Sequence, residues 1–166
     1  MIINYKDIKP VIDKSVFVAH SADVIGRVTL LEDVGIWYGT VLRGDCNSIH
    51  IGKGSNIQDN CTVHVGNNSS VEIGEYVTVG HNAVIHGCKI GSNCLIGMGS
   101  IILNDAEIGD ETIIGAGSLV TERKKIPSGV LCMGAPARVI RELTEDEKEK
   151  VRNSAFYYIE EANNHK

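Results

Sequence analysis

A six-residue period of aliphatic side chains runs through most of this 166-residue chain and restricts its fold more than any other feature. An amphipathic helix, with its repeat of about 3.6 residues, does not have this period, and neither does a simple hairpin meander. Every position in the series is Ile, Val or Leu, and thirteen of the sixteen steps are six residues long. The positions are Val18, Val24, Leu30, Ile36, Leu42, Ile51, Ile57, Val63, Ile73, Val79, Ile85, Ile90, Ile96, Ile102, Ile108, Ile114 and Val120.

A second column of small or β-branched residues lies two positions before the aliphatic one. Its members include Ser55, Cys61, Ala83, Cys88, Cys94, Ser100, Ala106, Thr112 and Ser118. Residues two apart in a strand point to the same side, so both columns would point inward from a short strand that is followed by a turn. Three such hexads predict one triangular coil, and the coils stack at the strand spacing of about 4.8 Å.

This pattern, over residues 10–125, resembles the hexapeptide-repeat, left-handed parallel β-helix. We therefore predict an all-β fold, with a left-handed β-helix domain in residues 1–125. The left-handed sense is implied by the resemblance, because the period alone defines no hand. The 18 glycines and the aromatic content of only 5% suit a narrow interior built in thin layers.

The prism needs a cap, and a C-terminal amphipathic helix is predicted for residues 144–166, folded back along the prism or along a neighbouring subunit. Thr144 and Glu147 have the spacing of a capping box, and the acidic first turn suits the helix dipole. The residues that share one helical face are Val151, Ala155, Tyr158, Ile159 and Ala162. Residues 126–143 are expected to form an irregular connection.

Composition argues against several kinds of partner. Sixteen basic and 21 acidic residues give a net charge of −5, whereas non-specific binding to nucleic acid or to an anionic membrane needs a basic surface. No apolar run is long enough to span a bilayer, and the first residues lack the layout of a signal peptide, so we expect a cytoplasmic protein. The five cysteines include no C-x-x-C pair, which argues against a cysteine-based zinc site.

The period also places two histidines in one row on the outer surface. If the extra residues of the longer steps form surface loops, Leu42, Val63 and Ile85 lie on the same face of successive coils. The residues that follow the last two, His64 and His86, then point outward and stack one coil apart. This arrangement suits two ligands of one metal ion.

A third histidine lies round a corner of the predicted prism. His81, like Asp59, follows two residues after an aliphatic position on another face. It cannot easily join the row of two histidines within one subunit, but it can do so from an adjacent subunit packed by threefold symmetry. We therefore expect a homotrimer with three shared sites, in which Arg43 of one chain faces Asp59 of the next.

The motifs around these residues resemble the signature of the γ-class carbonic anhydrase family; they are Arg43-Gly-Asp45, Gln58-Asp59-Asn60, His64, and Gly80-His81 followed by His86-Gly87. The resemblance implies that His64, His81 and His86 bind a divalent metal, usually zinc, with ligands from two subunits of a trimer. Fe²⁺ and Co²⁺ also accept three imidazoles.

The same resemblance implies roles for other residues. Gln58 corresponds to the residue beside the metal-bound solvent, and Tyr158 to a tyrosine of the C-terminal helix that approaches the site. Arg43, Asp45 and Asp59 correspond to the residues of the interface ion pairs.

The chemistry implied is the reversible hydration of carbon dioxide. Three neutral imidazoles leave the full charge of Zn²⁺ uncompensated and leave one coordination position open for water. The ion lowers the pKa of that water to about 7, and the resulting hydroxide can attack carbon dioxide to give bicarbonate. The resemblance thus implies a zinc-dependent carbonate dehydratase, which is a lyase.

The sequence departs from the best-characterised family pattern at the proton relay. Cys46 stands where those members carry a glutamate, and the segment 65–70 stands where they carry an acidic loop. A buried thiol is a poor relay at neutral pH unless its pKa is lowered. Nothing in the sequence places His20 near the site.

Two other functions are consistent with the repeat. A CoA-dependent hexapeptide acyltransferase needs a single general-base histidine, so it does not require two stacked histidines with Arg43 beside them. The segment Gly134-Ala-Pro-Ala-Arg138 occurs in both kinds of protein and does not discriminate between them. A metal-binding trimer with a scaffold role and little catalysis is the third interpretation, because both acidic relays are missing.

Overall fold

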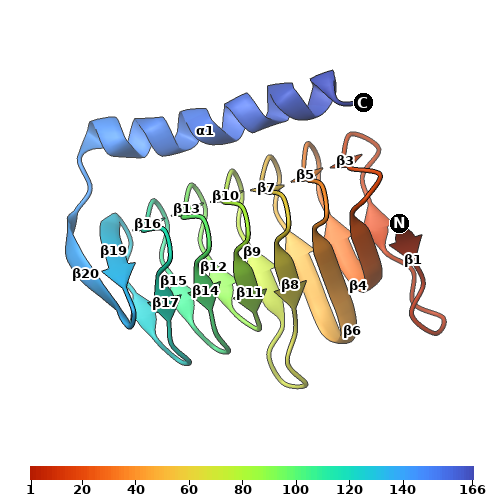
Figure 1. The fold of residues 1–166 in the computed structure, drawn as a ribbon, viewed down its shortest axis with the longest axis horizontal. Helices are drawn as coiled ribbons and strands as arrows, with labels where there is room; N and C mark the ends of the chain where they lie inside the picture. Colours follow the sequence, from red (N-terminus) through yellow and green to blue (C-terminus); the bar gives the residue numbers. More distant parts are fainter.

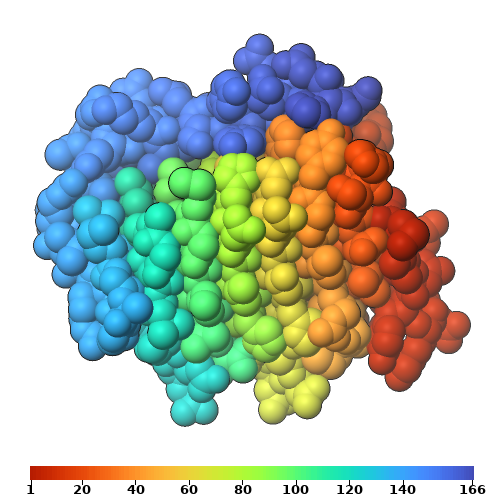
Figure 2. Space-filling view, in the orientation of Figure 1, coloured from red at the N-terminus to blue at the C-terminus, as the bar shows by residue number.

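Short parallel strands form three faces of a prism in the computed structural model, which describes residues 1–166 (Figure 1). Successive coils of the chain lie side by side as bands from the N-terminal to the C-terminal end (Figure 2). The helix α1 (Glu145–Asn164) runs back along one face toward the N-terminal coils.

The face that α1 covers is called the helix face. Its eight strands form one sheet, and they are β3 (Phe17–Val18), β5 (Gly35–Ile36), β7 (Asn56–Ile57), β10 (Thr78–Val79), β13 (Leu95–Ile96), β16 (Ile113–Ile114), β19 (Val130–Gly134) and β20 (Ala137–Glu142). The helix contacts β5, β7 and β10 of this sheet.

The other two faces join in a single 12-stranded sheet, because β4 (Asp23–Leu30) and β6 (Val41–Ile51) pair with strands of both. The histidine face contains the first halves of these strands with β1 (Ile2–Ile3), β8 (Thr62–His64), β11 (Val84–His86), β14 (Ile101–Ile102) and β17 (Leu119–Val120). The ladder face contains their second halves with β2 (Val11–Ile12), β9 (Val71–Ile73), β12 (Lys89–Ile90), β15 (Glu107–Ile108) and β18 (Lys125–Ile126).

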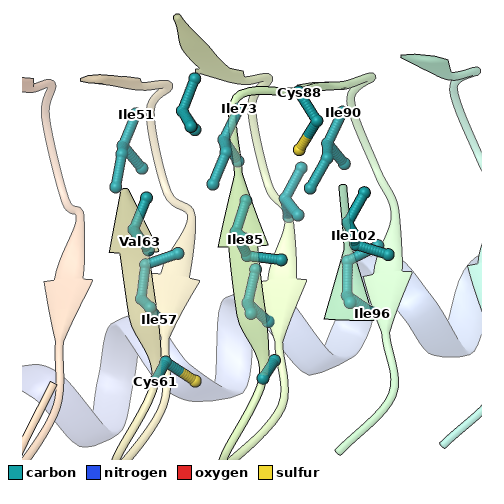
Figure 3. Close-up of a cluster of buried hydrophobic side chains, with 14 of the residues drawn as sticks. Ile51, Ile57, Cys61, Val63, Ile73, Ile85, Cys88, Ile90, Ile96 and Ile102 are labelled. Atoms are coloured by element: carbon teal, nitrogen blue, oxygen red, sulfur yellow. The ribbon is translucent and has the colours of Figure 1, made fainter. Parts of the chain in front are cut away.

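The register of the strands aligns the six-residue column of the sequence. Val63 pairs with Leu42 on one side and with Ile85 on the other, and Val79 pairs with Ile57 on the helix face. All of the seventeen aliphatic positions are buried except Val18, which is partly buried (Figure 3). The predicted left-handed parallel β-helix with a C-terminal helix is confirmed.

The small residues of the second column fill the space between the aliphatic layers. All nine members named above are buried, and the hydroxyls of Ser55 and Ser100 donate to backbone carbonyls of an adjacent coil. Burial raises the pKa of the Cys61 thiol to about 11 and those of Cys88 and Cys94 to about 12. These three thiols therefore serve packing and stay protonated at neutral pH.

Residues 126–143 differ from the predicted irregular connection. Ile126 and Cys132 continue the six-residue column, so β18 pairs with β15 and β19 pairs with β16 in parallel. The chain then reverses, and β20 pairs antiparallel with β19 to form a hairpin that ends the helix face. The prediction of an irregular connection was wrong because the period of six continues for two hexads beyond Val120, and each of them forms a strand.

The helix begins as its sequence predicts. Thr144 is the N-cap and accepts a hydrogen bond from the backbone N–H of Glu147, whose side chain accepts one from the Thr144 N–H. Val151, Ala155 and Ala162 are buried against the prism. The structure contains no helix with the length and apolar character needed to cross a bilayer.

Candidate metal centre

The corner that follows the histidine face is irregular after β8 and β11, whereas most other corners repeat one geometry. In the later coils, the third residue after each aliphatic position takes a positive φ, as at Asn93, Gly99, Asp105 and Glu111. After Val63 the chain instead continues into a loop over residues 65–70, which projects below its neighbours (Figure 1). The longer steps of the sequence thus produce a loop beside the outward row of histidines.

His64 and His86 occupy the last positions of β8 and β11 and are direct register partners. His64 Nδ1 lies 3.0 Å from His86 Nε2, and the ring centroids are 5.0 Å apart. A tetrahedral ion bound at about 2.0–2.1 Å from each nitrogen would place the two nitrogens roughly 3.3 Å apart. The pair therefore fits two ligands of one such ion with only a small adjustment.

Asp45 lies on β6, the strand adjacent to β8, and its carboxylate is next to the ring of His64. Its Oδ1 lies 3.0 Å from His64 Nε2, and its other oxygen accepts a hydrogen bond from Arg43 of the same chain. Partial burial disfavours the carboxylate, but the hydrogen bonds from His64, the Cys46 N–H and Arg43 outweigh this effect and hold the pKa of Asp45 well below its usual range. Asp45 is thus an ionised acceptor that orients the ring of His64.

Asp45, Cys46 and His64 also offer three potential ligand atoms within 4.8 Å of one another. We do not interpret them as a metal site of their own, because Arg43 and His64 already engage both oxygens of Asp45. Their geometry is that of an outer hydrogen-bonded layer around His64.

His81 lies at a different corner, as its sequence position predicts. It follows β10 of the helix face, and its Nδ1 lies 2.7 Å from Asp59 Oδ2. The nitrogens of His64, His81 and His86 do not all lie within 4.8 Å of one another in one chain. A single subunit therefore brings together two of the three predicted ligands and leaves the third apart.

Gln58 and Tyr158 are on the His81 side of the molecule. Together with His81 they line a groove of about 480 Å³ between α1 and the helix face. Gln58 is buried, and its Nε2 donates to Asn56 Oδ1 at 3.2 Å. Burial, together with the nearby Asp59 carboxylate, raises the pKa of Tyr158, so this phenol is a proton-bearing donor at neutral pH.

The predicted site residues thus form two halves. Arg43, Asp45, His64 and His86 make up the histidine half, and Gln58, Asp59, His81 and Tyr158 make up the groove half. Arg43 and Asp59, which we predicted to pair across an interface, have partners in their own chain here, namely Asp45 and His81. The three predicted metal ligands are therefore divided between the two halves, with His64 and His86 in one and His81 in the other.

Two residues of this region were missed from the sequence. Asn104 lies one coil beyond His86, and its Oδ1 is 2.6 Å from His86 Nδ1. Asn56 holds Gln58, and its own amide donates to Thr78 Oγ1. Only the positions of Asn56 and Asn104 within their hexads could have indicated these contacts. Those positions alone are not sufficient, because the register of the strands also depends on the lengths of the loops.

The proton-relay positions contain no acidic group, but one expectation about them was wrong. Cys46 is exposed rather than buried, and its Sγ lies 3.5 Å from the Val65 carbonyl oxygen. His20 packs against Tyr38 at the far end of α1, in a separate pocket that His165 also lines. Neither residue therefore forms an evident relay from the histidine pair.

The prism and its outward histidines define a hexapeptide-repeat β-helix protein with a candidate metal centre. The family described as "Bacterial transferase hexapeptide (six repeats)" matches residues 87–122. A putative acetyltransferase from Bacillus cereus has a crystal structure with a TM-score of 0.96, at 44% identity and with 98% of this chain and 94% of that chain covered.

Two curated relatives carry a more specific name. A "Probable carbonic anhydrase" of Methanocaldococcus jannaschii is 47% identical over 89% of this chain and 93% of its own length. "Gamma carbonic anhydrase 2, mitochondrial" of Arabidopsis thaliana is 44% identical over 99% of this chain, but the chain spans only 61% of that protein. The chain belongs to the γ-class carbonic anhydrase-like family of hexapeptide-repeat proteins.

Proposed function

We propose that this protein is a metalloenzyme that reversibly hydrates carbon dioxide to bicarbonate at a three-histidine site shared between the subunits of a homotrimer. The observation that carries the proposal is the split of the site. His64 and His86 form a pair 3.0 Å apart, and His81 lies outside their reach in the same chain. The names of the relatives support the reaction, and threefold packing is the arrangement that would complete three such sites together.

The donor set fits a zinc ion, and Fe²⁺ or Co²⁺ would also accept it. His64 and His86 of one subunit, with His81 of another, would hold the ion. Their outer nitrogens face Asp45, Asn104 and Asp59, respectively. When bound, such an ion acts as a Lewis acid and lowers the pKa of a coordinated water to about 7.

The other residues of the groove half orient the reacting water. The Nε2 of Gln58 is engaged by Asn56, which leaves its Oε1 available as an acceptor on the wall of the groove. This oxygen can accept the O–H of a water and so direct the water's lone pair toward carbon dioxide. Tyr158, which stays protonated, can donate to an oxygen of the product.

Proton release is expected to depend on buffer. No carboxylate occupies the loop 65–70, and the Cys46 position lacks the acidic group of the best-characterised family pattern. We expect a zinc-loaded or anaerobically iron-loaded trimer to hydrate carbon dioxide above the uncatalysed rate, with a turnover that rises with the concentration of imidazole buffer. Stopped-flow measurement with a pH indicator checks this, and the His64→Ala variant is the control.

An absence of hydration with either metal at high buffer concentration would contradict the enzyme proposal and favour the scaffold interpretation. An acyltransferase is the second candidate, because the Bacillus cereus structure that resembles this chain is named a putative acetyltransferase. Binding of acetyl-CoA, measured by calorimetry on the same preparation, separates the two: the carbonic anhydrase proposal predicts none. A cytoplasmic location remains an expectation, with which the five free cysteines agree.

A further inference from the structure

Both stacked histidines have a fixed hydrogen-bond acceptor on the side away from each other. His86 Nδ1 faces Asn104 Oδ1 at 2.6 Å, and His64 Nε2 faces Asp45 Oδ1 at 3.0 Å. An amide oxygen and a carboxylate oxygen only accept, so each of these ring nitrogens carries the hydrogen. In a neutral imidazole the second nitrogen then has a free lone pair.

The two lone pairs consequently point toward each other. They belong to His64 Nδ1 and His86 Nε2, which are 3.0 Å apart. Two lone pairs at this distance repel each other. A cation between the two nitrogens would remove this repulsion, because each nitrogen could then form a coordinate bond to it. From this geometry we propose that Asn104 is a positioning residue that sets the tautomer of His86 and thereby prepares the pair for a divalent cation. This inference rests on the proposed metal site and adds a residue to it.

The backbone around Asn104 is built to let its amide oxygen reach the ring. β14 stacks on β11, and the Asp105 N–H donates to the Gly87 carbonyl at 2.7 Å, so Asn104 lies over Gly87. Gly87 has a φ of +56°, and a Cβ at this position would lie 2.4 Å from Asn104 Oδ1. A side chain at residue 87 would thus occupy the space through which the amide oxygen approaches His86.

Because Asn104 has an amide rather than a carboxylate, it also affects the net charge around the two histidines. His64 is held by the carboxylate of Asp45, whose charge Arg43 partly compensates. His86 is held by a neutral group, so its partner adds no negative charge to the centre. An aspartate at residue 104 would still accept from Nδ1–H, but it would make His86 a more basic ligand.

Nitrogen-15 NMR of the metal-free protein tests the tautomer directly. We expect His86 to carry its hydrogen on Nδ1 in the wild type and in Asn104→Asp, and to show a mixture of both tautomers in Asn104→Leu. Zinc affinity, measured by competition with a chelator, should fall about 10–100-fold in Asn104→Leu. Asn68→Leu, the same change in the adjacent loop, is the control and should alter neither quantity.

A hydrogen on Nε2 of His86 in the wild type would overturn the inference, as would an unchanged tautomer and zinc affinity in Asn104→Leu. The tautomer is read without metal or substrate, so it is independent of the reaction. If the wild-type protein showed the Nδ1–H tautomer and bound zinc but did not hydrate carbon dioxide, the proposed function would fail while the role of Asn104 would stand.

Discussion

Replacing His64 with alanine is expected to abolish tight metal binding while the prism stays folded. The loss of an outer hydrogen-bond partner typically weakens metal affinity by about 10–100-fold, and the loss of a direct ligand costs more than that. Zinc stoichiometry after dialysis against a weak chelator measures the effect. The side chain of His64 lies on the outer surface, so its removal opens no cavity in the core.

His50→Ala is the matched control for this variant. His50 is exposed on the ladder half of β6, where it pairs with Glu72 rather than with another histidine. The His50→Ala variant should retain the full zinc content of the wild type. Equal zinc contents in the two variants would show that the stacked pair is not the metal site.

A single methyl group at Gly97 is expected to lower the free energy of unfolding by about 3 kcal/mol, the upper end of the range for overpacking. A Cβ at this position would lie 2.4 Å from the Ala116 nitrogen and 2.7 Å from the Ala116 Cα. Both atoms belong to the backbone of the next coil, so no side-chain rotation can relieve the contact. Urea unfolding of Gly97→Ala, followed by circular dichroism, gives the measurement.

Gly99→Ala, two residues along, separates steric from conformational effects. Gly99 has a φ of +69°, and a Cβ there would meet no atom within 4 Å. Equivalent corners carry Asn93, Glu111 and Arg123 at similar φ, so this backbone tolerates side chains. We expect a loss of about 1–2 kcal/mol at most. A larger loss at Gly99 than at Gly97 would contradict the close stacking of the coils.

The fold was predictable because each hexad of the sequence repeats the same pattern of residue types. The aliphatic position, the small residue two before it and the corner residue each define one part of a hexad, and the register follows from their alignment. The C-terminal hairpin was not predicted, because its first strand ends the repeat and its second strand pairs antiparallel. Cys132 continues the period of six, but nothing in that period indicates that the chain then reverses into an antiparallel strand.

The candidate site was predictable only in part. The stacking of His64 on His86 follows from register alone, since both come directly after aligned core residues. The role of Asn104 depends on the shortened step between Ile85 and Ile90 and on the positive φ of Gly87, which no pattern of residue types reveals. Within one chain Arg43 pairs with Asp45, and the predicted pair with Asp59 would need a second subunit, which the pattern of one chain's sequence does not define.

The shared site is tested most directly by mixing inactive subunits. His64→Ala and His81→Ala chains, unfolded together and reassembled, should regain zinc, because His64 and His86 of one chain meet His81 of the other. Random equimolar assembly would restore about one site in four. A mixture of His64→Ala with His86→Ala should restore none, since both ligands must come from the same chain. Recovery in the first mixture and not in the second is the predicted result; no recovery in the first, with mixed trimers confirmed by native mass spectrometry, would contradict a site shared between subunits.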